Sequence, residues 1–479
     1  MLLAFALRLV ALGAREIWYD DAFSIFLARQ DWAHIASGTA ADTMPPLYYF
    51  LLRLWLNLGD DAFMLRFLSV ILSTLIVALV YALARKMFSA RAARNAALVT
   101  AIAPFQIYHA QELRMYALLA LALLGYVYAF HELQFPNHAR RSNIQLWFVL
   151  ILAGALALYS HNLAILTLIV ADIFLVWQRA WRALAKLIAA QVVSVLLFVP
   201  WLLYVPGQLE KIQRAFWTLR PGLIDGMQLL LTFTTNLPLP AWFLPLALFV
   251  ALASFVIVCL ELFRAVRRGA PAGIGFIIFF ALVPPTLLFA ISYIIRPIFV
   301  PRGVIFSSLA YYLLIGWLLT RVRVRAEVAL VITLAIILTP ALAHQNSYNE
   351  FPRSPFRAAD AFLREQTRAG DAILHDNKLS FFPMRYYAPT LAQSFAADPP
   401  DSSNDTFARG SMDAIQIFPT TFEDATKEKS RVWFVIFQRA LDEAAAEGHA
   451  HENLKWMDAH FKQISLTRFN DLNVYLYER

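Results

Sequence analysis

The sequence predicts a mostly α-helical, polytopic membrane protein of about eleven transmembrane helices, followed by a small C-terminal α/β domain. Three observations lead to this fold class. Of the 479 residues, 60% are hydrophobic and only 15% are charged, which is more apolar surface than a soluble protein of this length can bury. Apolar segments long enough to cross a bilayer recur over residues 1–343. Residues 344–479 are more polar and hold most of the acidic side chains.

The apolar segments are closely spaced, and the first is short for a span. They lie at residues 1–15, 62–84, 92–108, 115–133, 145–160, 162–178, 183–204, 241–263, 273–295, 303–320 and 326–343. We interpret the first as a retained helix, because the acids after it do not resemble a signal-peptidase site. A mis-assigned start codon is the alternative. Cys259 is the only cysteine, so an intrachain disulfide is excluded.

Basic residues gather in every second connection between these segments. The five clusters are Arg85/Lys86/Arg91/Arg94, Arg140/Arg141, Arg179/Arg182/Lys186, Arg264/Arg267/Arg268 and Arg321/Arg323/Arg325. The positive-inside rule makes this side cytoplasmic. Much of the net charge of +8 is then an orientation signal, and no nucleic-acid partner is needed. We therefore expect a multi-pass protein of the cell (plasma) membrane.

The remaining connections then lie outside the cytoplasm, together with the C-terminal domain. The two longest are residues 16–61 and 205–240, and we expect amphipathic helices such as Pro206 to Trp217 to lie along the interface there. The predicted domains are a transmembrane domain at 1–343 and an extracytoplasmic α/β domain at 344–479.

The C-terminal domain shows helix and strand patterns but no phosphate-binding loop. The patterns predict helices at 355–368 and 440–460, and strands at 371–375, 432–437 and 472–477. This domain contains neither a Gly-rich phosphate loop nor a zinc-like ligand spacing. Because the sequence shows no dinucleotide fingerprint and no P-loop, no nucleotide cofactor is expected.

The first candidate catalytic group is the acid pair Asp20 and Asp21, directly after Trp18 and Tyr19. Aromatic rings favour the membrane interface, and the following carboxylates reach water. Neighbouring residues of a helix point about 100° apart, so one acid can face a cavity while the other caps a helix or binds a cation. The alternative is that one of them is only the N-cap of a helix over 22–29. Asp42 lies later in the same loop, before the rigid Pro45-Pro46 pair; a simple turn is its alternative.

A second cluster, His109, Glu112, Arg114 and Tyr116, occupies a short external connection. Charged groups this close to hydrocarbon are costly, so they usually mark a site or pair with each other. His161 lies in another short connection, where a hydrogen-bonded helix end is the alternative to a ligand role. Together with His109 and Glu112 it could bind a divalent cation, although the spacing is not diagnostic.

Arg66 and Arg302 stand near the outer membrane face, where the positive-inside rule disfavours them. Arginine suits phosphate because it chelates bidentately and stays charged. An external anion would explain both residues, and snorkelling to lipid headgroups is the alternative.

These stretches, in this order, resemble the family-39-type glycosyltransferases. That family comprises GT-C membrane enzymes such as the protein O-mannosyltransferases and the aminoarabinose transferases of lipid A. The resemblance covers roughly residues 1–320. It rests on Trp18-Tyr19-Asp20-Asp21, Pro45-Pro46-Leu47-Tyr48-Tyr49, Leu65-Arg66-Phe67-Leu68-Ser69, Gln111-Glu112-Leu113-Arg114-Met115-Tyr116, Tyr159-Ser160-His161 and Pro301-Arg302. Met44 stands where many members have His or Lys.

The resemblance implies a polyprenyl-phosphate-linked sugar as donor, transferred with inversion to a hydroxyl of a lipid, glycan or protein acceptor. In the family, an Asp-Glu pair in the first external loop supplies the base. Asp20 matches that Asp, and Asp21 replaces the Glu. We predict that Arg66, Arg114 and Arg302 bind the donor phosphate. Glu112, His109, His161, Asp42 and Tyr116 would bind substrate or an optional divalent cation.

Two other classes of function stay open at this point. A secondary transporter also has many spans, but it is expected to show internal repeats and acids at mid-bilayer. A non-catalytic lipid-binding or assembly protein would keep the fold without the chemistry. Release of sugar, as opposed to lipid binding alone, separates that reading from an enzyme.

Overall fold

The computed structural model describes residues 1–135, 143–214, 218–267, 272–399, 402 and 405–479. Its contacts divide the chain into two compact units. The helical unit is Met1–Leu12 with Thr39–Asn346, and the sheet unit is Gly13–Gly38 with Ser347–Arg479. Grouping of residues 13–38 with the C-terminal segment was not expected from the sequence. The predicted division into domains 1–343 and 344–479 stays a prediction.

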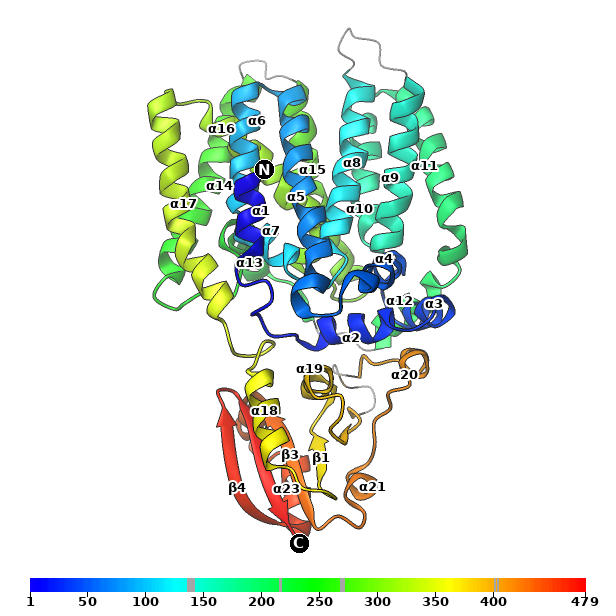
Figure 1. Cartoon of the computed structure of the whole chain (residues 1–479). Helices are drawn as coiled ribbons and strands as arrows, with labels where there is room; N and C mark the ends of the chain where they lie inside the picture. The colour runs from blue at the N-terminus through cyan, green and yellow to red at the C-terminus, as the bar shows by residue number, and fades with distance from the viewer. Residues whose placement is uncertain (136–142, 215–217, 268–271, 400–401, 403–404) are drawn as a thin grey trace. The chain divides into compact units, whose positions relative to one another are not determined.

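The helical unit contains a helix at each position where an apolar segment was predicted (Figure 1). Its elements are α1 (Leu2–Leu9), α4 (Leu47–Trp55), η1 (Leu56–Leu58), α5 (Ala62–Met87), α6 (Ala90–Ile102), α7 (Pro104–Ala110), α8 (Tyr116–Gln134), α9 (Asn143–Ser160), α10 (Ala164–Trp177), α11 (Trp181–Leu202), α12 (Val205–Arg214), α13 (Leu223–Thr235), α14 (Leu244–Arg267), α15 (Ala272–Ile294), η2 (Pro301–Val304), α16 (Ile305–Leu319) and α17 (Val324–Ser347). Helix α3 (Trp32–Ala41) crosses the boundary between the units. The mostly helical, polytopic fold class is confirmed.

Seven helices among the described residues are long and apolar enough to cross a membrane, and α9 and α10 are apolar but shorter. The predicted segment 92–108 is two helices, because Pro104 begins α7 after α6 has ended. Helix α12 covers part of the predicted interfacial stretch, whose residues 215–217 lie outside the described residues. The total of eleven crossings stays a prediction.

The bundle is held by close helix contacts and by ion pairs at one end. Helix α5 packs against α6 and α8, and α16 packs against α6 and α15 (Figure 1). Glu327 is buried and pairs with Arg91 and with Arg94, where Arg94 Nη2 lies 3.0 Å from Glu327 Oε1. Lys86 pairs with Glu132 at 2.8 Å. Arg91 also donates a hydrogen bond to the carbonyl of Val322, so the connections that hold two of the predicted basic clusters, 85–94 and 321–325, meet at this end.

Three of the predicted basic residues, Arg140, Arg141 and Arg268, lie outside the described residues. The assignment of this face to the cytoplasm stays a prediction.

The sheet unit is built on five strands in the order β2-β1-β3-β5-β4. Strands β1 (Ala372–His375), β2 (Gln393–Phe395) and β3 (Arg431–Phe437) are parallel, while β5 (Leu472–Glu478) is antiparallel to β3 and to β4 (Lys462–Phe469). The helices are α2 (Tyr19–Ala28), α18 (Phe356–Gln366), α19 (Lys378–Tyr387), α20 (Arg409–Ile415), α21 (Phe422–Thr426), α22 (Gln438–Ala446) and α23 (Glu452–His460).

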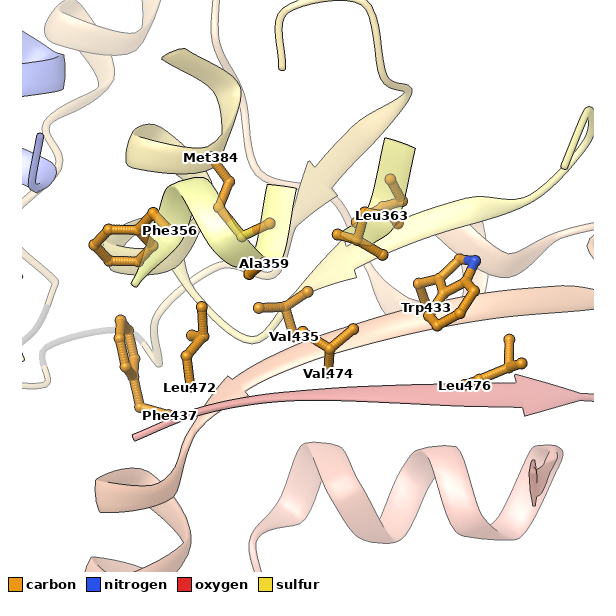
Figure 2. Close-up of a cluster of buried hydrophobic side chains, with 11 residues drawn as sticks. Phe356, Ala359, Leu363, Met384, Trp433, Val435, Phe437, Leu472, Val474 and Leu476 are labelled. Carbon is orange, nitrogen blue, oxygen red and sulfur yellow. The ribbon is translucent and has the colours of Figure 1, made fainter. Parts of the chain in front are cut away.

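Both faces of this sheet are covered, because side chains alternate along the strands. Trp433, Val435 and Phe437 of β3 face α18 and α19, as Figure 2 shows. Val432, Phe434 and Ile436 face α21 and α23. The small C-terminal α/β domain predicted from the sequence is therefore present.

The prediction of one helix over 440–460 is wrong. The structure has α22 and α23, separated by Gly448 with a φ of +83°. Glycine adopts this left-handed conformation without the penalty that a Cβ brings, and it ends the first helix there. The sequence reading also omitted β2 and β4.

Candidate active site

The connection between α7 and α8 places a buried histidine–carboxylate pair inside the helical unit. His109 lies in the last turn of α7, and its Nδ1 lies 2.7 Å from Glu112 Oε2. The two side chains are 4% and 1% exposed. Ser69 of α5 donates a hydrogen bond of 2.9 Å to the carbonyl of Glu112, which fixes the loop against the first long helix. The predicted cost of a charge near hydrocarbon is met here by pairing.

Tyr116, the first residue of α8, connects this pair to two further predicted residues. Its ring centroid lies 4.9 Å from that of His109 and 6.1 Å from that of His161. The guanidinium carbon of Arg302 lies over the same ring, 5.6 Å from its centroid. This distance suits a cation–π contact. Four residues from three separate chain segments, 109–116, 161 and 302, therefore meet around one phenol ring.

His161 lies in the connection between α9 and α10, and its Nδ1 accepts a hydrogen bond of 3.0 Å from the backbone N–H of Leu163. Burial, together with the positive charges of Arg302 and Arg114, lowers the pKa of this imidazole from 6.5 to about 3. His161 is therefore neutral at physiological pH. The two guanidiniums that act on it lie close enough to add their fields at one place.

Arg114 and Arg66 differ in what they contact. Arg114 is buried and donates a hydrogen bond of 3.2 Å to the hydroxyl of Tyr49. Arg66 is fully buried on α5, and its Nη1 donates to the carbonyl of Leu12 at 2.9 Å. Part of the role of Arg66 is thus to hold the chain that follows α1. The phosphate role predicted for each arginine stays a prediction.

Asp42 belongs to the helical unit and forms an ion pair with α12. Its Oδ1 accepts from Lys211 Nζ at 2.8 Å. Gln208 of the same helix accepts from Asn162 at 2.9 Å and donates to the carbonyl of Thr39 at 2.9 Å. These contacts tie the loop before the double proline to α12 and to the segment after His161. The geometry gives Asp42 a structural ion pair.

Asp20 and Asp21 belong to the sheet unit and lie in the first turn of α2. Trp18 is the N-cap residue, so neither acid is the N-cap that the alternative interpretation required. Asp21 is fully buried and its Oδ2 lies 3.5 Å from Arg353 Nη1. Asp20 is partly exposed, and its carbonyl accepts from Ser24 Oγ at 2.8 Å. The two acids thus differ in burial, and adjacent helical positions point about 100° apart.

The structure brings together His109, Glu112, Arg114, Tyr116, His161 and Arg302 within the helical unit. It describes the two units each by itself, so convergence of Asp20 with these residues stays a prediction. Among the described residues, no group of three or more His, Cys, Asp and Glu side chains is arranged to hold a metal ion. A cation at Glu112 stays a prediction.

Sequence reasoning missed the contact roles of Tyr49, Ser69 and Arg353. The first two stand in stretches that carried the family resemblance, so the motifs contained a signal for them. Arg353 follows the last predicted span and stands in no motif. Only its contacts reveal it.

Comparison with known proteins shows which family and which solved structures the chain resembles. Residues 43–204 match the family model described as dolichyl-phosphate-mannose-protein mannosyltransferase. Two structures of ArnT from Cupriavidus metallidurans, one apo and one bound to undecaprenyl phosphate, superpose with TM-scores of 0.67 and 0.66. Each is 15% identical, and each alignment covers 99% of this chain and 96% of that chain. The predicted resemblance to GT-C glycosyltransferases is confirmed.

The GT-C fold extends to a more distant neighbour. The oligosaccharyltransferase of Archaeoglobus fulgidus, in complex with Zn and sulfate, has a TM-score of 0.55 and 14% identity over 99% of this chain and 72% of that chain. No curated protein matches the sequence. At these identities the neighbours establish the fold, and the assignment of activity depends on the residues described above.

Proposed function

We propose that the protein is a membrane glycosyltransferase that moves a sugar from a polyprenyl-phosphate-linked donor to a hydroxyl acceptor, with inversion at the anomeric carbon. The observation that carries the proposal is the buried cluster around Tyr116, where Arg302 and Arg114 act on one small region beside the His109–Glu112 pair. The GT-C fold supports it, since one ArnT neighbour is bound to undecaprenyl phosphate and an archaeal neighbour to dolichol-phosphate.

The two guanidiniums suit a departing lipid phosphate. When the bond between the sugar and the phosphate breaks, negative charge builds on the phosphate oxygens. Preorganised cations in a buried site stabilise that charge in the transition state without having to reorient. Because His161 is neutral and its Nδ1 accepts from the backbone N–H of Leu163, its Nε2 carries the proton and can donate a hydrogen bond to a sugar hydroxyl. Arg114 and Arg302 are the phosphate-binding residues in this proposal.

Asp20 is the proposed base. It would take the proton of the acceptor hydroxyl as that oxygen attacks the anomeric carbon on the face opposite the phosphate. Asp21 is occupied by Arg353 inside the sheet unit and is less suited to this step. The active site is proposed to face the extracytoplasmic side, in accordance with the distribution of basic linkers. Glu112 with His109 would orient the acceptor or hold an optional cation.

The test uses purified protein, a polyprenyl-phosphate sugar and a panel of hydroxyl acceptors. Asp20→Asn should lower kcat by about 100-fold or more, since general base catalysis is worth roughly 10²–10⁴-fold. Arg302→Ala should chiefly raise the KM for the donor. Arg296→Ala is the matched control, because Arg296 lies in the same segment but contacts the carbonyl of Gln213. Transfer by Asp20→Asn at the wild-type rate would exclude this base.

A non-catalytic function would give a different result in the same assay. A protein that retains lipid phosphate but releases sugar from none of the donors would be a lipid-binding or assembly protein. Hexosyl and pentosyl donors are compared side by side, because the fold does not distinguish them.

A further inference from the structure

The acid pair lies in a segment that packs against residues far along the chain. Residues 13–38 form one compact unit with Ser347–Arg479. Helix α2 packs against α19, where the rings of Tyr19 and Phe26 lie 5.1 and 5.6 Å from that of Phe382. Aromatic contacts at these distances contribute beyond simple burial of area. More than 300 residues of sequence separate the two sides of this contact, so the sheet unit is where the candidate base is held.

Arg353 makes the most direct polar contacts with the start of α2. Its Nη1 donates to the carbonyl of Glu16 at 2.6 Å and lies 3.5 Å from Asp21 Oδ2. Its guanidinium carbon is 6.0 Å from the ring centroid of Trp18. Arg353 is 2% exposed and Asp21 is 0% exposed. A buried pair of this kind is worth little as a gain in stability, but it is costly to break and it fixes geometry.

Two further contacts hold the chain just before α2. Arg357 Nη2 donates to the carbonyl of Gly13 at 2.8 Å. The backbone N–H of Ile17 donates to the hydroxyl of Tyr387 at 2.8 Å. Together with Arg353, they fix both the path of residues 13–18 and the residue at which α2 begins.

We propose that Arg353 is a positioning residue for Asp20 and that the segment 347–479 fixes the position of residues 13–38, which carry this acid; we call this arrangement the clamp. The proposal rests on the proposed function, in which Asp20 is the base. Asp20 and Asp21 are consecutive positions of one helical turn, so holding Asp21 fixes the rotation of α2 about its axis. That rotation sets the direction of the Asp20 carboxylate, about 100° away. A displacement of about 1 Å at a reacting group can cost on the order of 100-fold in rate.

The experiment compares Arg353→Gln and Arg353→Lys with Arg431→Gln in the full-length protein. Arg431 is the matched control, since it forms a mostly buried ion pair of 3.0 Å with Asp371 in the same unit. It also contacts Gln366, Glu478 and Trp433, away from residues 13–38. Arg353→Gln should lower kcat on the order of 100-fold while the donor KM changes by less than about twofold. Arg353→Lys should restore part of kcat. Arg431→Gln should keep kcat near wild type.

Hydrogen exchange gives a readout that does not need activity. In Arg353→Gln, the amides of the first turns of α2 should exchange faster, while those of β1 and β3 keep their protection. Unchanged protection of α2, unchanged kcat, or an equal loss of kcat in Arg431→Gln would overturn the proposal. If the wild type transfers no sugar, the proposed function fails, and loosening of α2 in Arg353→Gln still decides whether the clamp exists.

Discussion

Acidification should destabilise the sheet unit through His375, the last residue of β1. His375 is fully buried, with Nδ1 3.0 Å from Ser380 Oγ and Nε2 2.9 Å from Gln393 Oε1. Gln393 Nε2 donates to the carbonyl of Ala388 at 3.0 Å, which orients its oxygen toward the ring. The arrangement suits a neutral imidazole that donates from Nε2 and accepts at Nδ1. Burial lowers the pKa of His375 from 6.5 to about 4.

The direction in which pH changes stability depends on whether the folded or the unfolded state binds the proton. Below pH 6.5 the unfolded chain protonates this histidine while the folded chain does not, so stability falls as the pH drops from 6.5 to about 4 and levels off below that. With these two pKa values, the loss at pH 5 relative to pH 7.5 is roughly 2 kcal/mol.

The assay is hydrogen exchange of the buried β1 amides at pH 7.5 and pH 5, corrected for intrinsic rates and converted to an opening free energy. His375→Gln serves as the comparison, because other groups also titrate. Burial raises the pKa of the neighbouring Asp376, for example, which acts in the opposite direction. The pH-dependent loss should be smaller in the variant by roughly 2 kcal/mol. An equal loss in both proteins would refute the reasoning.

Two further predictions concern the helical unit, and thermal unfolding in detergent checks both. Gly316→Ala should destabilise by about 1–3 kcal/mol, because its Cβ would lie 2.5 Å from the backbone nitrogen of Ala96; Gly125→Ala, with its nearest contact at 3.6 Å, should be tolerated, and equal unfolding temperatures for the two variants would contradict the packing argument. Glu327→Gln should cost roughly 1–3 kcal/mol, less than a fully buried pair, because its two arginine partners are 33% and 56% exposed. The difference in stability between this variant and the wild type should change little with salt concentration. A strong salt dependence would show that the ion pairs of Glu327 are exposed to solvent.

The sequence by itself determined the class of protein, the positions of its apolar helices and the residue types of the site. Hydrophobicity is a local property that can be counted along the chain. The motifs that carried the family resemblance are also local, because each is a short run of residues near the end of a helix. Arg114, Tyr116, His161 and Arg302 could each be named in advance, as members of separate predicted groups. Gly448 shows that prediction from sequence also fails locally, because the residue pattern of 440–460 predicted one helix where the structure has two.

Only the tertiary structure decided which partners these residues have. Asp21 and Arg353 are more than 300 positions apart, and no periodicity or spacing links them. Tyr116 became the centre of the cluster because three connections close on the same end of the bundle. Side-chain pairing depends on how helices and sheet pack in three dimensions, and packing is a property of the whole chain that a local pattern does not contain.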